Sequence, residues 1–148
     1  MELRIIKHGS EDYKEMIDLR MKILRTPLGL SFTKEQLSEE KNDVLIGAYA
    51  EDKLIGCCVL TRKNEKEIQL RQMAVNDDAQ HKGIGKVILE FAEKYALAAG
   101  YKVLMMHARD VAVPFYEKCG YIKKGDPFIE VTIPHFHMEK KLSPAHMA

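Results

Sequence analysis

The stretch that decides the fold is AVNDDAQHKGIGKVILEF, residues 74–91. An apolar strand end leads into a turn in which Gly83 and Gly85 lie between Lys82 and Lys86, and an amphipathic helix follows. The unpaired backbone NH groups at a helix start and the positive end of its dipole favour an anion there. Glycine lets an anion approach the backbone because it has no side chain. The stretch therefore predicts a phosphate-binding turn.

Two common phosphate motifs fail at specific positions of this turn. A Walker A loop requires Gly at position 80 and Ser or Thr at position 87, where the chain has Gln80 and Val87. A dinucleotide fingerprint requires a third glycine at position 88, which is Ile88, and it follows an early strand. The turn is therefore not predicted to bind a nucleoside triphosphate or a dinucleotide in either of these ways.

Composition limits the class of protein. The 148 residues include 23 Lys+Arg and 22 Asp+Glu, so a net charge of +1 provides no general field for nucleic acid or anionic lipid. The chain has three cysteines, none at zinc-knuckle spacing, and no signal peptide or long apolar run is apparent. We expect a single domain over residues 1–148, cytoplasmic, with no metal and no nucleic-acid or membrane partner.

Hydrophobic periodicity predicts the order of the elements before the turn. A short strand at 2–7 precedes a helix from about 12 to 25, which begins with a capping box of Asp12 and Glu15. A second capping box, Thr33 with Gln36, begins a shorter helix that reaches about Lys41. An antiparallel meander of strands follows, at 43–50, 53–62 and 67–75.

The elements after the turn complete a mixed sheet. Helical spacing from Ile84 to Ala99 leads to a strand at 101–108, so strand, helix and strand form a βαβ unit with parallel strands. A short helix within 109–120 and one or two final strands within 121–142 follow. The predicted fold class is α/β, with a central mostly antiparallel sheet, one parallel βαβ pair and flanking helices.

The turn QHKGIG, residues 80–85, resembles the coenzyme A pyrophosphate loop of the GNAT N-acetyltransferase superfamily. The order of features around it matches too: MAV (73–75) ends the preceding strand, and AVPFYEKCGY (112–121) has the alanine, tyrosine, glycine and tyrosine spacing of the family's last motif. The resemblance spans about 44–142. The stretches LRMKILRTPLG (19–29), HAR (107–109) and IPHFHM (133–138) resemble the ElaA-like bacterial subgroup.

This resemblance implies a GNAT fold and a reaction. Acetyl-CoA would donate its acetyl group to a primary amine of a small molecule or peptide by direct attack in a ternary complex. The pantetheine arm would enter a gap between strands 68–75 and 102–107. Arg109 departs from the asparagine that many members have there. The implied cofactor-binding residues are Met73, Ala74, Val75, Gln80, His81, Lys82, Gly83, Ile84, Gly85, Lys86, Arg109, Ala112 and Phe115.

The resemblance also implies catalytic roles. The backbone NH near Val75 would polarise the thioester carbonyl, and Tyr116 aligns with the general acid that protonates the thiolate. The base is open: Gln69 stands where some members have glutamate, so His107, His135 and Glu67 are the candidates, besides a water relay or an amine that arrives neutral.

Several properties stay open at this stage. A domain that binds acyl-CoA without turnover, as a sensor or interaction module, is the alternative to an enzyme. The acyl group could differ from acetyl, and family members often form homodimers through late strands, here 126–142.

Overall fold

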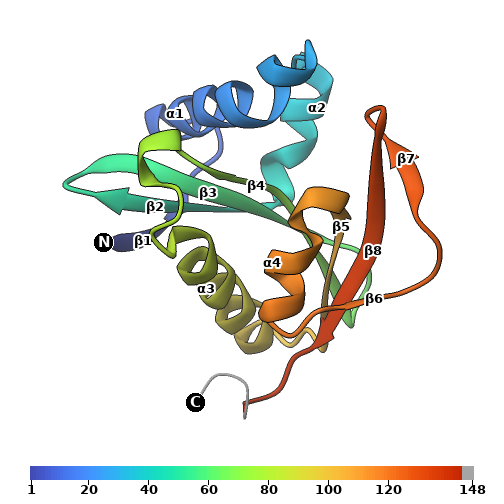
Figure 1. Cartoon of the computed structure of the whole chain (residues 1–148). Helices are drawn as coiled ribbons and strands as arrows, with labels where there is room; N and C mark the ends of the chain where they lie inside the picture. Colours follow the sequence, from blue (N-terminus) through green and yellow to red (C-terminus); the bar gives the residue numbers. More distant parts are fainter. Residues whose placement is uncertain (145–148) are drawn as a thin grey trace. The chain divides into compact units, whose positions relative to one another are not determined.

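The computed structural model describes residues 1–144, which form two compact units. Unit 1 comprises Met1–Thr61 with Leu70–Ala92, and unit 2 comprises Arg62–Gln69 with the chain from Glu93 onward. Strand β4 (Glu67–Val75) and helix α3 (Ile84–Ala98) contribute residues to both units. Hydrogen-bonded strands follow the order β1-β2-β3-β4-β5-β8-β6, with β7 on β8 (Figure 1). The predicted α/β class with a mixed sheet is confirmed.

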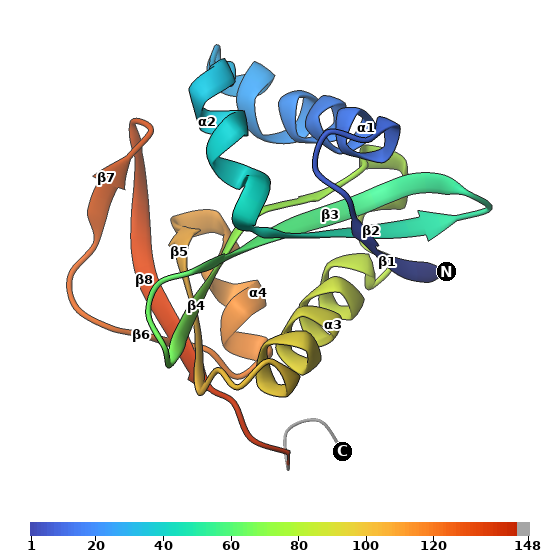
Figure 2. The same cartoon turned by 180° about the vertical axis from the view of Figure 1, so that it is seen from behind.

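Unit 1 contains the meander and the early helices. Its other elements are β1 (Glu2–Ile6), α1 (Glu11–Arg20), a π-helical turn (Met21–Arg25), a 3-10 turn (Thr26–Leu28), α2 (Lys34–Glu39), a 3-10 turn (Glu40–Asn42), β2 (Val44–Ala50), β3 (Lys53–Arg62) and a 3-10 turn (Asp77–Ala79). Strand β1 pairs antiparallel with β2, and β2 with β3 (Figure 2). Within unit 1, α1 and α2 cover one face of these strands and α3 covers the other (Figures 1 and 2). The predicted strands and the α3 helix are confirmed.

The start of α1 differs from the prediction. The N-cap is Ser10, whose hydroxyl accepts a hydrogen bond from the Tyr13 amide at 3.2 Å, so the predicted cap at Asp12 is wrong. The turn HGS already places Ser10 in an extended conformation, and the helix begins directly after it. The second capping box, Thr33 with Gln36, is confirmed by hydrogen bonds in both directions.

Strand β3 is buried on both faces. Cys57 packs in the cluster that includes Tyr13 and Met16 of α1. Gly56 faces α3, where an added Cβ would lie 2.7 Å from the Ile88 side chain, so only glycine allows this close approach. Because side chains alternate along a strand, Cys57 and Cys58 point to opposite faces and do not pair. Burial raises the pKa of the Cys57 thiol to about 12, which keeps it protonated.

Unit 2 contains the parallel pair and the C-terminal strands. Its elements are β5 (Val103–Arg109), a 3-10 turn (Asp110–Ala112), α4 (Val113–Lys118), β6 (Ile122–Lys123), β7 (Phe128–Glu130) and β8 (Ile133–Lys141). The parallel ladder of β4 and β5 runs from Glu67 opposite Val103 to Gln69 opposite Met105. Strand β5 then pairs antiparallel with β8 along its length.

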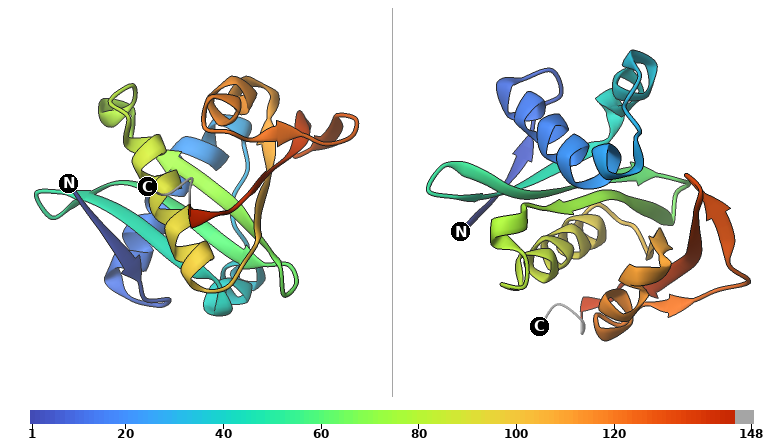
Figure 3. Two further views of the ribbon diagram at one scale, coloured as in Figure 1. Left: turned by 90° about the horizontal axis from the view of Figure 1, so that it is seen from below. Right: turned by 45° about the horizontal axis from the view of Figure 1, so that its top comes forward.

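The tail has more strands than predicted. Instead of one or two, the described residues include β6, β7 and β8, with β7 and β8 forming a hairpin (Figure 3). Strands β6 and β7 are short and exposed, so their sequences lack the apolar alternation that marks a strand. Their partner β8 supplies the pairing that holds them. Among the described helices, none has the length and apolar character needed to cross a membrane.

Candidate active site

The end of β4 presents backbone groups to one strand edge. The amide of Asn76 donates to the Ile55 carbonyl of β3 at 2.8 Å. Since successive NH groups of an extended chain point to opposite edges, the NH of Val75 points away from β3. The carbonyl of Val75 accepts a hydrogen bond from the Gln80 side chain at 2.9 Å. The strand end that was predicted to hold pantetheine therefore directs an amide of Val75 to the edge that β3 does not occupy.

Gln72 lies within β4, shortly before this end, and has an unusual backbone conformation. Its φ is +54°, a left-handed conformation that costs a non-glycine residue about 1–3 kcal/mol and that is enriched at functional sites. Its carbonyl accepts a weak hydrogen bond from the Cys57 thiol at 3.8 Å, and its buried side-chain Oε1 has no partner among the described residues. Gln72 was not predicted from the sequence, since nothing in a strand pattern indicates a left-handed residue.

The turn after β4 offers amide groups to an anion. The first helical hydrogen bond of α3 joins the Val87 amide to the Gly83 carbonyl at 3.2 Å, so the amides of 84–86 precede it and have no helical partner. Gly83 has φ +78°, and no atom lies within 4 Å of the position its Cβ would take. His81 is also left-handed, with φ +65°. His81, Lys82 and Lys86 are exposed around this open backbone.

The start of the turn is held in place from two directions. Lys22, which follows α1, donates to the side chain of Asn76 at 3.0 Å and lies 3.9 Å from a carboxylate oxygen of Asp77. Gln80, predicted to bind the cofactor, uses its side-chain amide on Val75 and lies 3.4 Å from Asp77. In this structure, Gln80 thus positions the strand end relative to the turn.

In unit 2, two of the candidate bases meet at one carboxylate. His107 Nδ1 on β5 lies 3.1 Å from Glu130 Oε1 on β7, and His135 Nε2 on β8 lies 3.8 Å from Glu130 Oε2. Phe128 packs its ring against both histidines, at centroid distances of 5.0 Å to His107 and 6.1 Å to His135. Glu130 was not predicted from the sequence, because nothing distinguishes a single functional carboxylate in a polar tail from a solvated side chain.

The turn that follows Glu130 is strained. Val131 and Thr132 form the two-residue turn of the β7–β8 hairpin with φ of +45° and +64°, although both are β-branched. Such turns favour Asn-Gly, because β-branched residues rarely adopt positive φ. The register pairs Glu130 with Ile133 across the turn and Phe128 with His135. The strained turn therefore sets which side chains of the hairpin face His107.

Tyr116 lies in a buried aromatic group on α4. Its side chain is 6% exposed and makes edge-to-face contacts with Phe115, at 5.1 Å between centroids, and with Tyr121, at 5.9 Å. Ala112 ends the 3-10 turn before α4, and Arg109 precedes that turn at the end of β5, opposite His135. The predicted acid and the nearby cofactor candidates thus follow directly on the strand that carries His107.

Glu67 lies apart from the two histidines. It begins β4, where its amide donates to the Asn64 side chain at 2.9 Å, and it pairs with Val103. Val103 is four residues from His107 on β5, which corresponds to about 13 Å of strand. The structure therefore groups His107 with His135 and not with Glu67. Within residues 1–144, no group of three or more His, Cys, Asp or Glu side chains is arranged to hold a metal ion.

Comparison with known proteins gives this geometry a family. The acetyltransferase (GNAT) domain family matches residues 28–142. The uncharacterized N-acetyltransferase YjcF of Bacillus subtilis is 25% identical over 139 residues, which cover 92% of this chain and 97% of YjcF.

Solved structures show the same fold. Escherichia coli ElaA superposes with a TM-score of 0.81 at 15% identity, covering 95% of this chain and 99% of ElaA. An aminoglycoside 6'-N-acetyltransferase complexed with coenzyme A superposes with a TM-score of 0.81 at 17% identity, covering 97% of this chain and 98% of the aminoglycoside enzyme. The phosphate-type turn, the mixed sheet and the family match agree, and the chain belongs to the GNAT family of acetyl-CoA-dependent N-acetyltransferases.

Proposed function

We propose that this protein transfers the acetyl group of acetyl-CoA to a primary amine of a small molecule or peptide by direct attack in a ternary complex. The observation that carries the proposal is the end of β4, where the Val75 amide points to the edge opposite β3. An extended pantetheine arm can pair with Met73 and Val75 there, as a strand added to a sheet edge does. A GNAT neighbour of the same fold is complexed with coenzyme A.

The turn after β4 is proposed to hold the pyrophosphate of the cofactor. Its amides at 84–86, the open backbone of Gly83 and the positive end of the α3 dipole favour an anion. The exposed side chains of Lys82 and Lys86 add positive charge. The family resemblance is the basis for proposing Arg109, Ala112 and Phe115 as further cofactor contacts.

The chemistry needs a donor to the thioester oxygen and an acid for the departing thiolate. The amide NH of Val75 is proposed to donate to the carbonyl oxygen as the amine attacks, an interaction whose loss costs about 2.7–4 kcal/mol of transition-state stabilisation in related acyl transfers. The C–N bond forms, the C–S bond breaks, and the Tyr116 hydroxyl donates its proton to the thiolate.

The turn is tested by a matched pair of glycine substitutions. Gly83 and Gly125 have φ of +78° and +79°, and neither would place a Cβ within 4 Å of another atom. Alanine strains both turns equally, but only Gly83→Ala is expected to raise the Kd for coenzyme A, by about tenfold, roughly 1.4 kcal/mol, with little change for pantetheine. Calorimetric titration measures both. Equal Kd values for the two variants would contradict the proposed pyrophosphate turn.

The acid is tested separately. Tyr116→Phe is expected to fold and to bind acetyl-CoA, and to slow single-turnover release of coenzyme A by about 10²-fold or more, most at high pH where water supplies few protons. A panel of amines and rapid-quench sampling give the rates. Rates equal to those of the wild type across the pH range would mean that Tyr116 only packs against Phe115 and Tyr121 and is not the acid.

A further inference from the structure

The hydrogen bonds around Glu130 determine which ring nitrogen of each histidine carries a proton. Carbonyl and carboxylate oxygens only accept hydrogen bonds. His135 Nδ1 lies 2.8 Å from the Ile133 carbonyl, so this nitrogen carries the proton and donates. By the same rule, His107 Nδ1 carries a proton and donates to Glu130. Neutral His107 then has its lone pair on Nε2, the ring nitrogen farthest from the backbone.

Burial separates the two histidines further. The His135 side chain is 4% exposed, and its remaining nitrogen Nε2 faces Glu130, so neither of its nitrogens is directed to a substrate. The His107 side chain is 31% exposed, with Nε2 outside the Glu130 contact. Phe128 fixes the plane of His107 by an edge-to-face contact at 80°. His107 is therefore the histidine of this pair that can accept a proton from a bound molecule.

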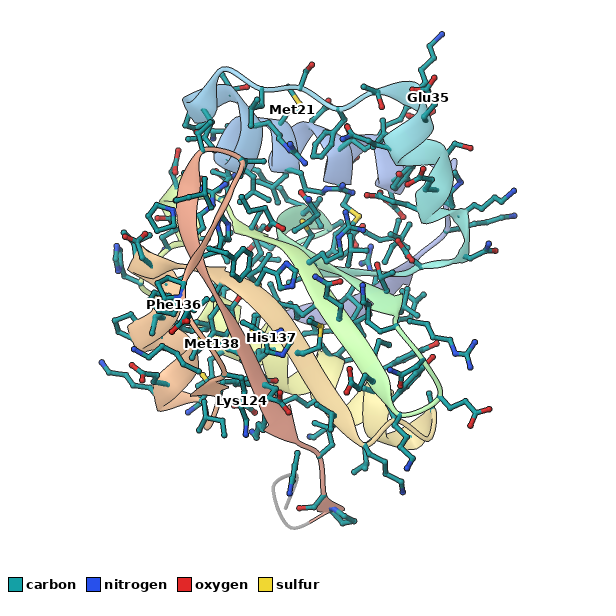
Figure 4. The ribbon with its side chains drawn as sticks, turned by 90° about the vertical axis from the view of Figure 1, so that its right-hand side faces the viewer. Met21, Glu35, Lys124, Phe136, His137 and Met138 are labelled. Carbon is teal, nitrogen blue, oxygen red and sulfur yellow. The ribbon has the colours of Figure 1, made fainter. Side chains whose placement is uncertain are left out.

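A second His–Glu pair on the same sheet face uses the other ring nitrogen of its histidine. His137, which lies between Phe136 and Met138 on β8 (Figure 4), is the cross-strand partner of His107. Its Nε2 lies 3.3 Å from Glu139, and its side chain is 32% exposed. The carboxylate thus occupies the outer nitrogen of His137, and the nitrogen left over is the one next to its own backbone. His137 is about as exposed as His107 but has its outer nitrogen occupied by a carboxylate, so the pair of His137 and Glu139 serves as a control.

We propose that His107 is the general base of the acetyl transfer and that Glu130 is its positioning residue. This assignment rests on the proposed function. Nε2 of His107 takes the proton that the amine loses as the C–N bond forms. The thiolate released by C–S cleavage takes its proton from Tyr116, the proton on His107 passes to solvent, and Tyr116 regains a proton from solvent, so the sum is amine plus thioester to amide plus thiol. Glu130 fixes the tautomer of His107 and stabilises its imidazolium, and buried His135 lies 3.8 Å from the other oxygen of Glu130.

Charged and titratable groups lie around His107, and of these only Glu130 is within hydrogen-bond distance of its ring among the described contacts. Glu130 and His135 face it from the hairpin, His137 with Glu139 from β8, and Arg109 follows on its own strand. Loss of the Glu130 charge destabilises the imidazolium, so the pH dependence of turnover is expected to move to lower pH in a variant that lacks this carboxylate.

Kinetics of four variants test the assignment with the full-length protein. His107→Ala is expected to lower kcat by about 10²–10⁴-fold with an unchanged Kd for acetyl-CoA, and added imidazole is expected to restore part of the rate. Glu130→Gln is expected to lower kcat by about 10- to 100-fold and to move the pH profile to lower pH. The controls His137→Ala and Glu139→Gln are expected to stay within about twofold of wild type.

The outcomes separate this assignment from the proposed function. If His107→Ala keeps wild-type kcat, or if Glu130→Gln lowers kcat without moving the pH profile, the assignment is overturned while acetyl transfer stands. If the wild type binds acetyl-CoA and acetylates no amine of a broad panel, the proposed function fails and the base with it. Should His107→Ala not fold, His107→Gln and the exposed-site variant Glu130→Gln give the same decision.

Discussion

Two glutamates of unit 2 each hold two side chains, but in different surroundings. Glu93 on α3 is 4% exposed and accepts hydrogen bonds from the Tyr121 hydroxyl at 2.7 Å and from Lys140 Nζ at 3.2 Å. Glu130 is 44% exposed and faces His107 and His135. One carboxylate is sealed between a tyrosine and a lysine, and the other is open to solvent between two histidines.

The difference shows what each network can do. Burial, together with the charge of Glu93, raises the pKa of Tyr121 far above its usual value, so this hydroxyl stays a donor at any ordinary pH. A network whose protons do not move can only stabilise the fold. The partners of Glu130 are imidazoles, the side chain that serves most often as an acid or base in enzymes, and solvent reaches the carboxylate. The open network is therefore suited to proton transfer.

Unit 1 contains another buried carboxylate network, centred on Glu40 and an arginine. Glu40 accepts from Tyr13 at 2.7 Å and from both terminal nitrogens of Arg20, at 2.8 and 2.6 Å. Arg20 is 0% exposed, and its guanidinium lies 4.6 Å from the Phe32 ring centroid. In the Glu93 network, Lys140 remains 14% exposed, and its one nitrogen makes longer contacts to the two carboxylate oxygens, at 3.3 and 3.2 Å. We therefore expect the three carboxylates to rank Glu40, Glu93 and Glu130 in their effect on stability.

Glu40→Gln is expected to have the largest effect. It leaves the Arg20 guanidinium buried without its counter-charge, which destabilises a fold by about 3–5 kcal/mol. Urea unfolding followed by circular dichroism gives the free energy of unfolding. The neighbouring exposed residue provides the control, since Glu39→Gln is expected to change stability by less than about 0.5 kcal/mol. A loss below about 1 kcal/mol for Glu40→Gln would mean that Arg20 finds water in the variant.

Glu93→Gln is expected to cost about 2 kcal/mol, a smaller loss. Lys140 also donates to the Cys119 carbonyl at 3.0 Å, and its partly exposed ammonium can turn to solvent when the carboxylate is gone. The same urea titration measures it, with exposed Glu90 on the same helix as control. A loss equal to that of Glu40→Gln would remove the ranking of the two sealed networks.

The Glu40 network also predicts an acid dependence. Burial acts to raise the pKa of Glu40, but the hydrogen bonds from Arg20 and Tyr13 outweigh it and lower the pKa below 4.5. The stabilisation is therefore present above the unfolded-state pKa and is lost as pH falls through the folded-state value. Unfolding free energies between pH 7 and pH 3 are expected to fall more steeply for wild type than for Glu40→Gln. Parallel curves would assign the acid sensitivity to other carboxylates.

The hairpin beside the open carboxylate is expected to gain stability when its strain is removed. Val131→Asn with Thr132→Gly places the preferred residues at two positive φ angles and is expected to add about 1 kcal/mol. The β2–β3 turn is the control: Glu51 and Asp52 have φ of +51° and +63° without β-branching, so the same change there is expected to gain less. A loss of stability at 131–132 would show that its side chains contribute contacts that outweigh the strain.

Glu130→Gln is expected to change stability least, by less than about 0.5 kcal/mol, because an exposed ion pair contributes little. Together with its expected slower turnover, this result would separate the open network from the sealed ones. Thermal unfolding of the variant beside Glu93→Gln gives the comparison. A Tm loss as large as that of Glu93→Gln would make Glu130 a structural residue.

Some features of the protein could be predicted from the sequence, and others became visible only in the structure. The turn QHKGIG could be recognised because a glycine pair at a helix start depends on neighbouring residues only. The Ser10 cap was missed because serine and aspartate are both good caps, and the backbone decides between them. Glu130 was missed because its partner His107 is 23 residues away, and only strand pairing brings the two together.

By itself, the sequence determined the order of strands and helices as far as α4, the parallel βαβ unit and the phosphate-type turn, since each follows from local periodicity and glycine conformation. Only the tertiary structure decided the left-handed Gln72, the direction of the Val75 amide and the tautomers around Glu130. These features depend on pairing between strands that are distant in the chain. Such contacts cannot be predicted from local sequence patterns, because the register of the sheet decides which residues lie next to each other.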